Sequence, residues 1–242
     1  MTSTDPNDPE LPKAYFSRAG LIEGAVAMVP IVLSQTAFGV VFGTLGAQKG
    51  LTLAETVSMS GFVYAGLSQV VSLQSWPQDF TVPALFALAL ATAAVNLRFL
   101  LMSVTFRPWF GTLPAWQAYP TLLLTTDASW LRSMNYRNSG GGDAGFFLGG
   151  ALLLYVNWLI AAVVGYTFAS WIADPRVFGI DLLIPVYFAL LLVPAWKGPR
   201  RAIPWLISGA VALAVHHFVQ GYWFMIAGAL CGAVSAGFIA DE

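Results

Sequence analysis

Two ionisable side chains, Arg98 and Asp127, interrupt long apolar stretches of this sequence. If these stretches lie in a lipid bilayer, each charge costs about 2.5–3.5 kcal/mol to insert. Charges at that depth usually face a protein interior or a water-filled path, and they often pair with each other or bind protons. The two residues therefore indicate a transport path, in which Asp127 alternates between Arg98 and a proton or a substrate amine.

The positions of the two charges in the chain favour a direct pair. Arg98 lies about eight residues before a polar connection at residues 107–119, and Asp127 lies about eight residues after it. At a rise of 1.5 Å per residue, both lie about 12 Å from the same membrane face on antiparallel neighbouring helices. A salt bridge lowers the cost of each charge. A static pair that only fixes helix packing remains the alternative.

The tract Tyr64–Gln69 is unusually polar and rich in small residues for the middle of an apolar span. A helix that unwinds at Gly66–Gln69 would direct free backbone N–H and C=O groups at a ligand, as the broken helices of transporters do near the midplane. A continuous helix whose small residues pack against a neighbour explains the same residues equally well.

We expect the substrate site to include this tract and residues from two further apolar spans. Proline in a membrane helix can free a carbonyl group for a site, although kinks that serve only packing are about as common. The predicted substrate-binding residues are Tyr64, Gly66, Ser68, Gln69, Pro30 and Asn96; the predicted coupling or gating residues are Asp127 and Arg98.

The composition indicates an all-α, polytopic helical membrane protein. The 242 residues are 57% hydrophobic and 10% charged, with a mean hydropathy of +0.71, whereas an ordinary globular domain carries about 25% charged residues. The apolar runs are too long for barrel strands and lack their alternation. The formal net charge of −1 provides no basic patch for nucleic acid.

We expect seven or eight hydrophobic helices, some of them short or broken. Residues 1–18 are predicted to be a disordered cytoplasmic tail, and residues 19–240 a single transmembrane transport domain. Three GxxxG pairs, Gly39/Gly43, Gly145/Gly149 and Gly228/Gly232, are predicted to pack helices. The expected spans cover approximately residues 20–47, 53–76, 82–106, 116–133 (the weakest), 145–172, 180–196 and 203–239, the last either a hairpin divided at Gln220-Gly221 or one bent helix.

Positive residues favour a cytoplasmic N-terminus. With eight spans and the N-terminus inside, cytoplasmic positions collect Lys13, Arg18, Arg132, Arg137, Lys197, Arg200 and Arg201, whereas the outside receives Lys49, Arg107 and Arg176.

The sequence predicts no cofactor and no metal site. His216 and His217 are adjacent, so on a helix they point about 100° apart and are poor joint ligands. No GxxxxGK[ST] motif for ATP is present. An intramembrane hydrolase that uses Ser68, Ser129 or a histidine is a rival hypothesis, but no base is recognisably paired with either serine. A scaffold subunit that transports nothing is a third.

Several tracts occur in the order found in the AzlC family, and the chain resembles that family over about residues 19–239. The Tyr-Ala-Gly-x-Ser-Gln tract is the most specific of them. The matching tracts are Val29-Pro30-Ile31, Phe38-Gly39-Val40-Val41-Phe42-Gly43, Tyr64-Ala65-Gly66-Leu67-Ser68-Gln69, Asn96-Leu97-Arg98 and Thr126-Asp127.

The resemblance implies the large subunit of a two-component exporter of branched-chain amino acids in the bacterial inner membrane. It also implies a small AzlD-type membrane subunit of four spans as partner. We expect a secondary, proton-driven permease that exports leucine, isoleucine, valine and sometimes methionine, and not an enzyme. The chain departs from the family in having Ala128 and Phe99, where a second carboxylate and a histidine are frequent.

Overall fold

The computed structural model describes residues 13–74, 76–77, 79–169, 196, 198–219 and 223–240. These residues form helices, and their β-structure is limited to an isolated bridge between Tyr15 and Asp143. The all-α prediction is therefore confirmed for the described chain. The chain divides into two compact units, one within Met1–Trp76 and Asn96–Ile180 and the other within Pro77–Val95 and Asp181–Glu242.

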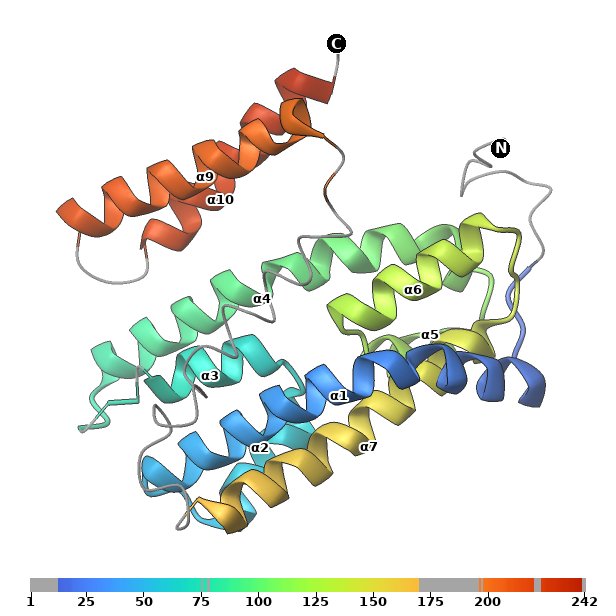
Figure 1. Ribbon diagram of the computed structural model, residues 1–242, viewed down its shortest axis with the longest axis horizontal. Coiled ribbons are helices and arrows are strands. Elements are labelled where there is room, and N and C mark those ends of the chain that lie inside the picture. Colours follow the sequence, from blue (N-terminus) through green and yellow to red (C-terminus); the bar gives the residue numbers. More distant parts are fainter. Residues whose placement is uncertain are drawn as a thin grey trace. The chain divides into compact units, whose positions relative to one another are not determined.

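The first unit is built on α1 (Arg18–Gln48) and α7 (Ala144–Phe168), which lie side by side along most of their lengths (Figure 1). Among the described residues, these two helices are long and apolar enough to cross a membrane, and α4 (Val82–Phe110) adds a third if its two halves count as one span. The expected sixth span, with Pro185, lies outside the described residues apart from Trp196.

Small residues bring α1 and α7 into backbone contact. A Cβ atom added to Gly24 would overlap the carbonyl oxygen of Phe146, and one added to Gly149 would overlap that of Leu21. The predicted packing role of the glycine pairs is confirmed, because every member of them has a close neighbour on the facing helix or at its start. Those neighbours include Ala161 for Gly39, Ala162 for Gly43, Ser17 for Gly145, and Ser208 for both Gly228 and Gly232.

Two of the expected spans are broken into shorter helices. The segment at 53–76 forms α2 (Leu53–Val63) and α3 (Gly66–Gln74). The expectation of one span over residues 116–133 is wrong, because this segment forms α5 (Ala115–Leu122) and α6 (Asp127–Asn138).

A capping box explains why a new helix begins at Asp127. The Thr126 side chain accepts a hydrogen bond from the backbone N–H of Ser129, and the Ser129 hydroxyl accepts one from the backbone N–H of Thr126. This reciprocal pair satisfies N–H groups that a helix start leaves without partners. The same device, formed by Thr52 and Glu55, begins α2.

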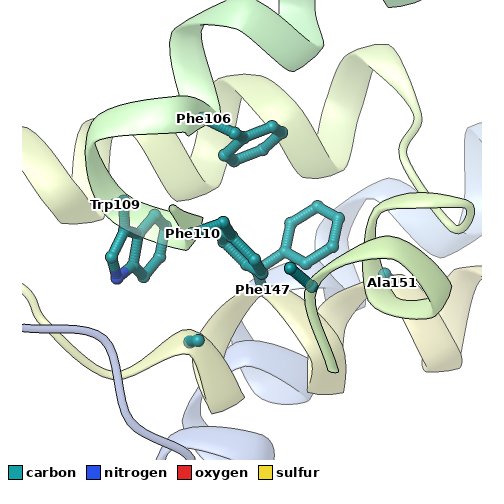
Figure 2. Close-up of a cluster of buried hydrophobic side chains, with 7 residues drawn as sticks. Phe106, Trp109, Phe110, Phe147 and Ala151 are labelled. Carbon is teal, nitrogen blue, oxygen red and sulfur yellow. The ribbon is translucent and has the colours of Figure 1, made fainter. Parts of the chain in front are cut away.

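Aromatic side chains close one end of the first unit (Figure 2). Phe106, Trp109 and Phe110, in the last turn of α4, pack with Phe147 and Ala151 of α7. The indole N–H of Trp109 donates to the carbonyl oxygen of Gly142 at 3.0 Å. The buried indole therefore holds the connection between α6 and α7 against the end of α4.

Asp143 joins the start of α7 to the start of α1. Its carboxylate accepts from the backbone N–H of Gly145 at 2.8 Å and from that of Ser17 at 3.1 Å, as well as from the Ser17 hydroxyl. Residues 1–12 of the segment expected to be a disordered tail lie outside the described residues, and Arg18 at its other end already belongs to α1.

The second unit contains α9 (Pro199–Phe218) and α10 (Trp223–Ala240), which pack against each other (Figure 1). The expected C-terminal hairpin is thus confirmed over the bent-helix alternative, although its turn at Gln220-Gly221 lies outside the described residues. The described residues 79–95, which include the first half of α4, also belong to this unit.

The glycine contacts predict how α1 and α7 respond to an added methyl group. Gly24→Ala should lower the melting temperature in detergent, because the overlapping atom belongs to the backbone of α7 and overpacking costs about 1–3 kcal/mol. Gly209→Ala in α9 is the matched control: its Cβ would meet open space, and alanine favours a helix by up to about 1 kcal/mol. Equal melting temperatures for the two variants would contradict the close contact.

Candidate functional site

The break between α2 and α3 is centred on Tyr64. This residue has φ 36° and ψ 49°, and it is the one non-glycine residue with positive φ in the described chain. A left-handed conformation costs an L-residue about 1–2 kcal/mol. The Tyr64 ring packs edge-on against Tyr155 at 4.9 Å, and its hydroxyl accepts from Nε2 of Gln35 at 3.5 Å. Contacts with α1 and α7 therefore hold the break in place.

The helix breaks slightly earlier than the sequence suggested. Tyr64 and Ala65 leave the helix, whereas the expected unwound stretch Gly66–Gln69 forms the first turn of α3. The first backbone bond of α3 runs from the N–H of Gln69 to the carbonyl of Ala65 at 2.9 Å. The N–H groups of Gly66, Leu67 and Ser68 precede that bond, and such groups are a ready anion-binding site.

Two side-chain hydroxyls donate to backbone carbonyls beside the break. The Tyr155 hydroxyl donates to the carbonyl oxygen of Gly61 at 3.0 Å, near the end of α2. The Ser68 hydroxyl donates to the carbonyl oxygen of Ala65 at 2.9 Å. Ser68 was expected to bind substrate, and its hydroxyl proton is used within α3.

Gln69 is the most unusual of the expected site residues. Its side chain is fully buried, and neither its amide nitrogen nor its amide oxygen has a hydrogen-bond partner within the described structure. Leaving a buried polar group unpaired costs about 1–3 kcal/mol. Such a group in a native protein calls for a ligand, a water molecule or a second conformation.

A chain of polar side chains leads from Tyr64 to α7. Thr36 donates to Oδ1 of Asn157 at 2.9 Å, Asn157 donates to Oε1 of Gln35 at 3.3 Å, and Gln35 donates to Tyr64. Thr36, Gln35 and Asn157 are not among the site residues predicted from the sequence. The signal was available, because all three are polar residues inside apolar spans, as Arg98 is.

The predicted pair of Arg98 and Asp127 is confirmed. Nη1 of Arg98 lies 3.0 Å from Oδ2 of Asp127, with the two side chains 28% and 21% exposed. Asp127 is also the first residue of α6, and a carboxylate is stabilised at a helix N-terminus. The guanidinium of Arg98 lies 5.1 Å from the ring centre of Phe99.

The break between α2 and α3 and the break between α5 and α6 both lie against the pair formed by α1 and α7. Ala128, next to Asp127, packs with Met28 of α1 and Leu154 of α7. The break at Tyr64 contacts Gln35, which is seven residues further along α1. At 1.5 Å per residue the two contacts are about 10 Å apart along the helix. The α1–α7 pair therefore positions both candidate sites.

The structure does not bring every expected site residue to the break. Pro30 lies on an exposed side of α1, and Asn96 has a buried Oδ1 without a partner among the described contacts. A separate apolar pocket of about 720 Å³ lies between the end of α4 and α5, with Leu100 and Leu123 in its lining. None of the expected site residues lines that pocket.

The described residues show neither a nucleophile paired with a base nor a metal site. The hydroxyl of Ser129 belongs to the capping box, and that of Ser68 donates to a backbone carbonyl. No group of three or more His, Cys, Asp or Glu side chains that could hold a metal ion occurs in the part of the chain that the structure describes.

A known family matches the part of the chain that holds the site. The model of the AzlC family, described as AzlC protein, matches residues 30–172, which is more than half of the chain. The match contains both breaks and the ion pair, and it ends well before the expected limit of the resemblance near Ile239. No curated protein and no solved structure matches the chain.

The ion pair predicts a non-additive stability pattern. Asp127→Asn and Arg98→Met should each lower the melting temperature, because each leaves one charge without its partner. Breaking a fully buried pair costs about 3–5 kcal/mol of stability. The loss here should be smaller, since solvent reaches both side chains. The double variant Arg98→Met/Asp127→Asn should be more stable than the sum of the two single losses, measured as thermal unfolding in detergent. Strict additivity would show that the pair does not interact.

Proposed function

Because the chain belongs to the AzlC family, we propose that it is a secondary exporter of branched-chain amino acids and the large subunit of a two-component permease. Family membership and the apolar helices α1 and α7 make it a membrane protein associated with transport. The observation that carries the finer proposal is the helix break at Tyr64, beside the buried and unpaired amide of Gln69.

The break offers hydrogen-bond donors for the carboxylate of an amino acid and an acceptor for its ammonium group. The N–H groups that open α3 suit a carboxylate, and the amide oxygen of Gln69 suits an ammonium group. Broken helices serve zwitterions in this way in other transporters. Apolar side chains such as Phe38 and Phe42 would surround the aliphatic chain. Because one methylene changes binding by only about 1–3 kcal/mol, such walls accept several small hydrophobic amino acids.

Asp127 is the proposed coupling group, and Arg98 is its counter-charge. The closed ion pair and its place at the start of α6 support this role. Ala128 and Phe99, the neighbours of the two charges, are not titratable, so no second carboxylate or histidine stands beside them. Protonation of Asp127 would release Arg98, which ties the state of the pair to the proton gradient.

The setting of the exporter follows from the resemblance and from the distribution of positive residues. We propose seven or eight spans in the bacterial inner membrane with a cytoplasmic N-terminus. A four-span AzlD-type subunit would be the partner. The apolar surface of α1 and α7 and the excess of Lys and Arg on the predicted cytoplasmic side support this arrangement.

Export can be measured directly as leucine efflux. Cells loaded with a leucine-containing dipeptide should release leucine faster when this chain is produced together with the small subunit. Asp127→Asn should abolish the dependence of that rate on external pH and lower the rate at least tenfold, because the proton-binding carboxylate is lost. Asp79→Asn, which changes an exposed carboxylate in a connection, should leave both unchanged.

Two results would count against the proposal. Wild-type rate and pH dependence in Asp127→Asn would remove the coupling role. The chain would instead be a scaffold subunit if its production left leucine efflux unchanged and the small subunit became less abundant when the chain was absent.

A further inference from the structure

Trp158 of α7 has a buried indole N–H group that no residue of the described structure uses. The residue is 2% exposed, and its Nε1 has no hydrogen-bond partner there. The indole groups of Trp109 and Trp130 differ in this respect. They donate to the carbonyl oxygen of Gly142 at 3.0 Å and to the hydroxyl of Thr105 at 2.8 Å. Within the described structure, the N–H of Trp158 is therefore available to donate a hydrogen bond, whereas the N–H groups of the other two already donate one.

The Trp158 ring lies directly at the break. A Cβ atom added to Gly66 would stand 2.7 Å from Cη2 of Trp158, so only glycine lets the first turn of α3 approach the ring this closely. Phe38 and Phe42 of α1 fix the ring from other sides, with ring centres at 5.5 Å and 5.9 Å. The indole is thus held against the start of α3 rather than free to turn away.

Gln69 shares that location. It follows Gly66 by three residues, so both lie on the same face of α3. Helical side chains lean toward the N-terminus of their helix, and the Gln69 amide therefore leans toward the Gly66–Trp158 contact. Two buried side chains from different helices, neither with a hydrogen-bond partner among the described residues, therefore lie at the first turn of α3.

We infer that Trp158 and Gln69 form one subsite, which binds the charged end groups of a free α-amino acid. The indole N–H and the amide N–H₂ of Gln69 bind the carboxylate together with the first-turn N–H groups of α3. The amide oxygen of Gln69 accepts from the ammonium group. An indole can only donate, whereas an amide can donate and accept, so this set matches a zwitterion. The inference rests on the proposed export of amino acids.

The subsite requires both end groups of the ligand. A buried site that expects a hydrogen bond rejects an analogue that lacks it far more strongly than an apolar wall rejects a missing methylene. Leucine amide lacks the carboxylate, and N-acetyl-leucine lacks the ammonium group. Both keep the leucine side chain, so an apolar pocket alone would still accept them.

The experiment measures leucine binding to the purified two-subunit complex in nanodiscs by calorimetry. Trp158→Phe, which keeps an aromatic ring but removes the N–H together with the rest of the bicyclic indole, should raise the Kd for leucine at least tenfold. Gln69→Met should do the same. Gln69→Met should leave the melting temperature unchanged, because the Gln69 amide makes no hydrogen bond within the described structure. Trp158→Phe should lower it only by the packing that the smaller ring loses. Trp116→Phe, on an exposed part of α5, is the matched control and should leave the Kd unchanged.

A structural role would give a different pattern. Trp109→Phe loses the same part of a buried indole and also the bond to Gly142, so it should lower the melting temperature more than Trp158→Phe does; an equal fall in the two variants would overturn the inference. Wild-type affinity in Trp158→Phe and Gln69→Met would overturn it as well while leaving amino-acid export intact. Competition by leucine amide or N-acetyl-leucine as strong as by leucine would exclude the zwitterion subsite. If the wild-type complex binds no leucine, the proposed function fails together with this subsite.

Discussion

Backbone contact between α1 and α7 is the constraint on which the first unit depends. Lipid provides no hydrophobic force to bring two apolar helices together, so their association relies on van der Waals packing that small residues permit. Gly24 and Gly149 place the two backbones in contact, and the pair then offers one continuous surface to the shorter helices. Met28 and Leu154 receive the start of α6, and Gln35 and Tyr155 receive the break between α2 and α3.

That surface is what makes broken helices tolerable inside an apolar protein. Lipid cannot satisfy the backbone groups that a helix end exposes, so irregular backbone must be covered by protein or line a cavity. At the end of α2 the Tyr155 hydroxyl supplies a partner for a carbonyl, and at the start of α6 the Thr126–Ser129 box supplies partners for N–H groups. Among the described residues, no side chain accepts a hydrogen bond from the first N–H groups of α3, which sets this helix start apart from those of α2 and α6.

The sequence predicted these features unequally, for physical reasons. The Arg98–Asp127 pair could be predicted because a charge in lipid is so unfavourable that it needs a partner. The glycine contacts could be predicted because a Cβ atom would keep two helix backbones apart. The division of residues 116–133 was missed because hydropathy averages over the segment, although Thr126 and Ser129 carry a capping signal. Trp158 could not be found from its type, since an aromatic residue in an apolar span is ordinary. That its N–H lacks a partner among the described residues is visible only once α1, α3 and α7 are packed around it.

The two candidate sites differ in how far the protein satisfies them by itself. At the ion pair, Asp127 has Arg98 and a helix start, and Arg98 has Asp127 and the Phe99 ring, while the buried Nε of Arg98 has no partner among the described residues. The break keeps neutral donors and an acceptor without partners. A ligand that satisfies the break gains contacts the protein lacks, whereas a proton at Asp127 must compete with contacts already made. Because both sites lie against the same α1–α7 surface about two turns apart, a ligand at the break and a proton at Asp127 would share one packed framework and use separate groups.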